Sequence, residues 1–217
     1  MKSNRAWREA VLISLPLYLA ALVVACAPTS SPLGGPGSRS DAATFVGPVD
    51  VPRAEPCSSL LSRPATPVEQ GWTTVRLPCL TEEAEVEVAA LGAVEGGPVV
   101  VNLWASWCTP CREEMPRLEQ AAREAADDGV RFVGVATRDA PERSGEFLRS
   151  LGVTFPQLSD VSGDLLAELG VPGLPVTVAV AGGAVVGQHV GPASAQDLAD
   201  LVNEALDAEV ASEAATP

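Results

Sequence analysis

The stretch that decides the fold is residues 99–111, VVVNLWASWCTPC. It begins with an apolar run typical of a central strand that is covered on both faces. A helix-forming segment over 109–127 follows it, so the two cysteines three residues apart stand between a strand and a helix. Unpaired N–H groups and the helix dipole favour a thiolate at a helix N-terminus. The arrangement predicts redox chemistry at Cys108 and Cys111.

Within this pair the two thiols are expected to differ. Cys108, at the helix N-terminus and nearest solvent, is predicted to be the attacking thiol, and Cys111 the more buried resolving thiol. A zinc site would need four cysteine or histidine ligands. His189 is the only histidine and is predicted to be a solvent-facing strand residue, while Cys57 and Cys79 lack metal-ligand spacing. We therefore expect neither a metal site nor a cofactor.

Hydrophobic periodicity places further elements along the chain. Strands alternate with helices and are followed by a hairpin through two glycines and a last amphipathic helix. This order predicts an α/β sheet with helices on both faces. The expected strands are 73–77, 85–89, 98–104, 130–136, 155–158, 176–180 and 184–190, and the expected helices are 109–127, 142–151, 163–169 and 195–206.

The N-terminal segment has the pattern of a signal peptide. Three basic residues precede the apolar run 11–25, which is shorter than the about 20 residues that span a membrane. The run ends in LVVAC, residues 22–26, which resembles the bacterial lipobox and implies a diacylglycerol on Cys26. An uncleaved anchor and an ordinary cleaved signal are the alternatives. In each case the rest lies outside the cytoplasmic membrane, where disulfides persist.

Composition divides the remaining chain. We expect a signal peptide over 1–25, a lipid-anchored flexible linker rich in proline and glycine over 26–55, a domain over 56–207 and a disordered tail over 208–217. The formal net charge of −14 argues against nucleic acid as a partner.

Two runs resemble a known family. Residues 102–116, NLWASWCTPCREEMP, closely resemble the active site of TlpA-like and ResA-like membrane-tethered thioredoxins. Residues 155–160, FPQLSD, and 170–177, GVPGLPVT, resemble the second signature of that family. The resemblance, over about 68–207, implies a thioredoxin-like fold with a central mixed β-sheet, an N-terminal β extension and an inserted helix–strand over 138–160.

The same resemblance implies roles for residues around the cysteines. Glu114 would be a semi-buried acid that moves protons to or from Cys111. The alternative is a first-turn carboxylate that the helix dipole favours. Thioredoxins often place a buried Asp six residues before the first cysteine, where this chain has Asn102, which cannot titrate.

A substrate-binding surface is implied beside these residues. Pro175 would follow a cis peptide bond and face the two cysteines, with an ordinary trans proline as the alternative. The backbone of Leu174 would pair with a substrate peptide by strand addition. Trp107 would cover the disulfide and offer an apolar surface to partners, while Trp104 is expected in the core.

Cys57 and Cys79 lie outside the family motifs. In an oxidising compartment we expect them to form a structural disulfide. The alternative is a second, labile pair that exchanges electrons with Cys108 and Cys111.

These observations together predict an extracytoplasmic, lipid-anchored thiol–disulfide oxidoreductase that acts on protein thiols and disulfides. The first hypothesis is a reductase that receives electrons from a membrane protein, with apocytochrome c as the best-known target in the family. The second is an oxidase that inserts disulfides into exported proteins. A non-catalytic partner-binding module and a peroxidase are weaker alternatives, and a copper chaperone would need a wider cysteine spacing and a histidine ligand.

Overall fold

The computed structural model describes residues 47–61, 73–93 and 97–215. The expected signal peptide over 1–25 and the expected lipidation site Cys26 lie outside these residues. No helix in the part that the structure describes combines the length and apolar character that crossing a membrane requires.

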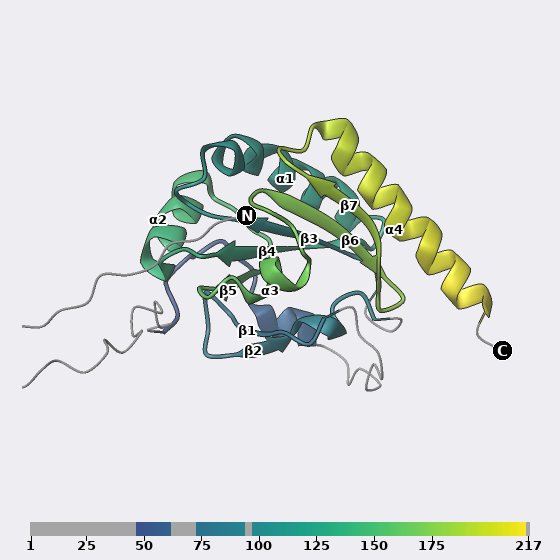
Figure 1. Ribbon diagram of the computed structural model, residues 1–217, viewed down its shortest axis with the longest axis horizontal. Helices are drawn as coiled ribbons and strands as arrows, with labels where there is room; N and C mark the ends of the chain where they lie inside the picture. The colour runs from purple at the N-terminus through teal and green to yellow at the C-terminus, as the bar shows by residue number, and fades with distance from the viewer. Residues whose placement is uncertain (1–46, 62–72, 94–96, 216–217) are drawn as a thin grey trace, which may run out of the picture. The chain divides into compact units, whose positions relative to one another are not determined.

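A five-stranded sheet forms the centre, in the order β5-β4-β3-β6-β7 (Figure 1). Strands β3, β4 and β5 are parallel, whereas β6 pairs antiparallel with β3 and β7 antiparallel with β6. The predicted mixed sheet is therefore confirmed. The strands are β3 Val99–Trp104, β4 Arg131–Thr137, β5 Gln157–Asp160, β6 Val176–Ala181 and β7 Ala184–Val190.

Strand β3 is buried along its whole length, which explains its nearly unbroken apolar sequence. Val100 and Trp104 contribute to the hydrophobic cluster on one face of the sheet. The alternate residues Val99, Val101 and Leu103 contribute to the cluster on the other face. Asn102 places a polar side chain on the first face, where α1 lies, as the alternation of a strand requires.

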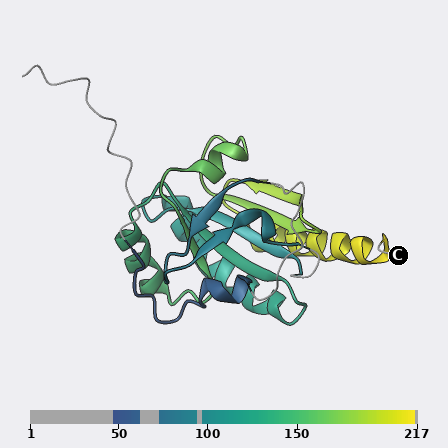
Figure 2. The ribbon, with the colours of Figure 1, turned by 90° about the horizontal axis from the view of Figure 1, so that it is seen from below.

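The two faces of the sheet are covered differently. Helices α1, α2 and α4 contribute to clusters on one face, and Figure 1 shows α1 above the sheet and α2 at its left end. The other face carries a β-hairpin, two 3-10 turns and the short α3 (Figure 2). The helices are α1 Thr109–Ala126, α2 Pro141–Leu151, α3 Asp164–Glu168 and α4 Ala195–Ala215, and the hairpin and turns are β1 Arg76–Pro78, β2 Glu85–Glu87, η1 Cys57–Leu61 and η2 Val88–Ala90.

The folded region begins earlier than predicted. Residues 47–55 were expected to belong to the linker, but Val51 is buried in the cluster beneath α2. The backbone N–H of Val49 donates to Leu80 O at 2.8 Å, and that of Glu55 to Thr154 O at 2.7 Å. Apolar side chains at 49 and 51 and these backbone bonds hold the segment on the domain, despite its prolines.

The C-terminal helix also continues past its predicted end. Helix α4 runs to Ala215, whereas the sequence predicted an end at Leu206 and a disordered tail over 208–217. The added residues are mainly alanine and glutamate, which are strong helix formers. Ser212 on this extension lies beside Gly182 in the β6–β7 turn.

Candidate active site

Cys108 and Cys111 form a disulfide at the N-terminus of α1, with Cα atoms 5.3 Å apart. Cys108 is the N-cap residue, and its sulfur accepts a hydrogen bond from the Cys111 backbone N–H at 3.3 Å. Cys108 is 6% exposed, whereas Cys111 is fully buried. The solvent side of the disulfide is therefore Cys108, the sulfur that the sequence assigned to attack, and the helix N-terminus favours its thiolate.

The loop before the disulfide is held by a carboxylate that sequence reasoning missed. Asp139 follows β4, and its side chain accepts hydrogen bonds from Ser106 N at 2.6 Å and Ser106 Oγ at 2.9 Å. It also accepts from Ser144 Oγ at 2.7 Å and Ala140 N at 3.0 Å. Asp139 thus ties the redox loop to α2. The only signal in the sequence was an acidic residue, Asp139, shortly before the proline that begins α2. The sequence gives no sign of its partner, because Ser106 lies 33 residues earlier.

Trp107 is the exposed aromatic side chain beside the disulfide, at 58% exposure. Its Nε1 donates to Arg138 O at 3.0 Å, which fixes the ring. Nearby, Arg112 donates to Ser106 O at 3.1 Å and places its guanidinium 4.9 Å from the Phe147 ring centre. The residues Ser106, Trp107, Arg112 and Phe147 line a groove of about 450 Å³. An exposed aromatic residue beside such a groove is suited to contact a partner.

Glu114 lies one turn after Cys111 and is fully buried, rather than semi-buried as predicted. Its Oε1 accepts from Asn102 Nδ2 at 3.1 Å, and its Oε2 accepts from Ala193 N at 2.8 Å. Burial raises the pKa of Glu114, and these two hydrogen bonds, together with the positive charge of Arg117, act in the opposite direction. A buried acid with a raised pKa, one helical turn from a thiol, is suited to exchange protons with that thiol.

Asn102 connects this acid to the neighbouring strand. Besides Glu114, its Nδ2 donates to Thr177 Oγ1 on β6 at 2.9 Å. Its Oδ1 is buried and accepts no hydrogen bond from the described residues. Asn102 therefore holds Glu114 with a neutral amide.

The peptide bond between Leu174 and Pro175 is cis, as the resemblance implied. Pro175 is buried, and Leu174 is half-buried between the two hydrophobic clusters. The carbonyl of Pro175 accepts a hydrogen bond from Gly191 N at 3.0 Å. Thr177, two residues further on, is the partner of Asn102. The predicted pairing of Leu174 with a substrate strand stays a prediction.

Cys57 and Cys79 also form a disulfide, with Cα atoms 6.0 Å apart. Both are fully buried in the cluster on the hairpin face of the sheet. Their sulfurs and a carboxylate oxygen of Glu82 lie within 4.8 Å of one another. The disulfide leaves no thiolate to bind a metal, and Glu82 Oε1 accepts a hydrogen bond from Ser58 N at 2.6 Å. The bridge ties η1 to the end of β1.

His189 on β7 is half-buried rather than fully solvent-facing. Its Nδ1 lies 3.8 Å from an Oδ1 of Asp197 on α4. Among the described residues, His189 belongs to no cluster of three or more side chains that could hold a metal ion.

Known proteins are similar to this chain in sequence. The thiol-disulfide oxidoreductase ResA of Halalkalibacterium halodurans is 29% identical over 111 residues, which are 51% of this chain and 63% of that protein, less than two thirds of its length. The thiol:disulfide interchange protein HelX of Rhodobacter capsulatus is 33% identical over 135 residues, which are 61% of this chain and 71% of that protein.

A solved structure is also similar to this chain. It is a secreted disulfide oxidoreductase of Mycobacterium tuberculosis that is homologous to DsbE of Escherichia coli. It matches with a TM-score of 0.51 and 28% identity, over 62% of this chain and 96% of that chain. The thioredoxin-like fold that the resemblance implied is thereby confirmed. The model of the AhpC/TSA family matches residues 73–189, more than half of the 217 residues, and the chain therefore belongs to that family.

Proposed function

We propose that this protein is a thiol–disulfide oxidoreductase whose reacting groups are Cys108 and Cys111. The observation that carries the proposal is the disulfide itself. It lies at a helix N-terminus, with Cys108 6% exposed and Cys111 fully buried. The names of the similar ResA and HelX proteins support the same reaction.

In the reducing direction, the Cys108 thiolate attacks one sulfur of a protein disulfide. A mixed disulfide forms, and the other substrate sulfur leaves as a thiolate and takes up a proton. The Cys111 thiolate then attacks Cys108 Sγ and releases the second substrate thiol. Two electrons pass to the substrate, and the Cys108–Cys111 disulfide remains. Glu114 is placed to accept the proton that Cys111 loses in the second step.

We infer that reduction is the physiological direction. The substrates would be exported protein disulfides, such as those of apocytochrome c, and a membrane protein would return electrons to Cys108–Cys111. The opposite direction, insertion of disulfides, uses the same steps in reverse. Measuring the reduction potential of the Cys108–Cys111 pair distinguishes the two directions. A thioredoxin-like reductant has a potential of about −270 mV, and a strong oxidant has one of about −120 mV.

We also propose that the domain works outside the cytoplasmic membrane, tethered through a lipid on Cys26. The buried Cys57–Cys79 disulfide supports an oxidising compartment. The sequence of residues 22–26 supports lipidation. Feeding cells a labelled fatty acid tests the anchor, because the label should enter the wild-type protein and not the Cys26→Ala variant.

A trapping experiment tests the activity. Cys111→Ser removes the resolving thiol, so we expect a stable mixed disulfide between Cys108 and the substrate. Mass spectrometry should identify the partner, and dithiothreitol should release it. Cys108→Ser is the matched control, because it keeps one thiol in the motif but removes the more accessible of the two cysteines. Equal trapping by both variants, or none by either while the wild-type disulfide resists small dithiols, would overturn the proposal.

A further inference from the structure

The turn between β7 and α4 contacts the active site through its backbone. The N–H of Gly191 donates to Pro175 O at 3.0 Å, and the N–H of Ala193 donates to Glu114 Oε2 at 2.8 Å. One short turn thus reaches both the cis-proline segment and the buried acid. Because both donors are backbone groups, the position of the turn itself decides whether these hydrogen bonds form.

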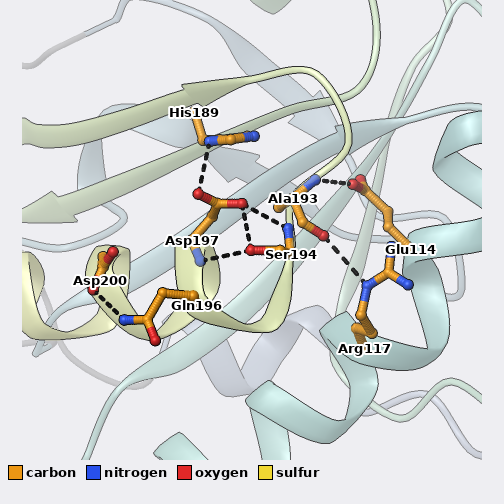
Figure 3. A network of polar contacts seen from close by, with 8 residues as sticks. All are labelled: Glu114, Arg117, His189, Ala193, Ser194, Gln196, Asp197 and Asp200. Atoms are coloured by element: carbon orange, nitrogen blue, oxygen red, sulfur yellow. Dashed lines mark hydrogen bonds and ion pairs between the residues drawn. The ribbon is translucent and has the colours of Figure 1, made fainter.

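The turn is held by a capping box at the start of α4 (Figure 3). Ser194 N and Ser194 Oγ donate to Asp197 Oδ2 at 2.8 and 2.6 Å, and Asp197 N donates back to Ser194 Oγ at 3.2 Å. Such reciprocal bonds fix the entry of a chain into a helix. Arg117 Nε also donates to Ala193 O at 3.3 Å. The residue that contacts Glu114 therefore directly precedes the fixed residue Ser194.

We propose that Ser194 and Asp197 are positioning residues, which hold the Ala193 N–H against Glu114 and so control when this acid carries its proton. The inference rests on the proposed function for its importance to thiol exchange. Neither side chain contacts Glu114 in the described structure, and both act through the backbone of the turn.

The charges around Glu114 give the direction of the effect. Arg117 faces it from its own helix and His189 from β7. The Asn102 amide faces it from β3, and the Ala193 N–H from the turn before α4. Burial raises the pKa of Glu114, and the hydrogen bond from Ala193 N–H is the largest of the effects that lower it. A looser turn weakens this opposition, so Glu114 should keep its proton to higher pH. His189 also faces Asp197 at 3.8 Å, and it is left unchanged in every variant.

The test is an NMR titration of the Glu114 side-chain carboxyl carbon in the oxidised, full-length protein. Comparison with Glu114→Gln assigns the signal. Ser194→Ala removes the capping hydroxyl, and we expect the titration midpoint to move to higher pH by about half a pH unit. Ser194→Thr keeps a hydroxyl and should restore the wild-type midpoint. Ser162→Ala is the matched control, because Ser162 Oγ donates to Asp164 Oδ2 at the same 2.6 Å beside α3.

A double-mutant comparison separates the turn from the charge of Asp197. In an Asp197→Ala background the Ser194 hydroxyl loses its carboxylate partner and keeps only the bond from the backbone N–H of residue 197. Adding Ser194→Ala should therefore move the midpoint less than it does in the wild-type background. An unchanged midpoint in Ser194→Ala, a failure of threonine to restore it, or an equal shift in Ser162→Ala would each overturn the inference. If the midpoint moves as expected but the reduced wild-type protein exchanges with no disulfide, then the proposed function fails and the positioning role stands.

Discussion

The two disulfides of this protein lie on opposite faces of one sheet and have opposite surroundings. Cys108–Cys111 closes a separation of 3 residues at a helix N-terminus, and Cys108 keeps a small exposed fraction of 6%. Cys57–Cys79 closes a separation of 22 residues, and neither sulfur is accessible. Both sulfurs of that second bridge lie close to Gln157 O, at 3.3 and 3.6 Å. Access and a helix N-terminus, rather than the presence of a disulfide, distinguish the reactive pair.

The lengths of the closed segments also differ in their effect on stability. A bridge across 22 residues restricts the unfolded chain much more than one across 3 residues. Cys57–Cys79 is therefore placed to stabilise the fold, and Cys108–Cys111 can open and close at little structural cost. We interpret the first as structural and the second as reactive.

Removing Cys57–Cys79 should cause the largest change in stability. The double variant Cys57→Ala, Cys79→Ala should lower the free energy of unfolding by about 3 kcal/mol, because the unfolded chain regains the entropy of the opened loop. Urea denaturation measures this. Exchange of the folded variant with glutathione disulfide should keep the wild-type rate, whereas Cys108→Ser should lose exchange and keep its stability. A parallel loss of exchange in the double variant would instead make Cys57–Cys79 a second redox pair.

The sequence predicted the fold because its deciding signals are local. The apolar run of β3, the cysteines after it and the glycines of the β6–β7 turn each lie within a few residues. The start of the folded region was not predicted, because Val49 and Val51 are two apolar residues among prolines and glycines. Their contacts lie far along the chain, as in the bond from Val49 to Leu80.

The site was predicted only where a motif marked it. Cys108, Cys111, Glu114 and the cis-proline belong to recognisable runs. The partners of these residues do not, because Ala193 lies 79 residues after Glu114 and contributes only a backbone N–H. A backbone donor has no side-chain signal in a sequence, since every residue except proline carries one.

Asp139 should give an intermediate effect that sharpens the comparison. Asp139→Asn replaces one accepting oxygen with an NH₂ group that faces the donors from Ser106 and Ser144. We expect the free energy of unfolding to fall by about 2 kcal/mol, together with slower exchange at Cys108. Thermal unfolding and alkylation of the reduced protein measure the two effects. Asp164→Asn is the control, since this exposed residue lies beside α3, and it should leave the exchange rate unchanged. Unchanged exchange in Asp139→Asn would contradict a role in holding the redox loop.

Glu114 should give the smallest effect, because its hydrogen bonds partly offset the consequence of burial. Its pKa is raised in the folded protein, so above the ordinary value of about 4.3 the unfolded chain loses this proton first. Unfolding then releases a proton, and raising the pH lowers the free energy of unfolding until Glu114 ionises in the folded state as well.

Asp160 has a pKa raised by burial and contributes in the same direction, but it is present in both wild type and Glu114→Gln. Subtracting urea-denaturation curves of the two oxidised proteins across pH therefore isolates Glu114. The wild type should lose stability relative to the variant as the pH rises from about 4.3. The difference in free energy of unfolding between the two proteins could instead stay constant with pH. In that case Glu114 would not give Cys108–Cys111 the proton-sensitive surroundings that Cys57–Cys79 lacks.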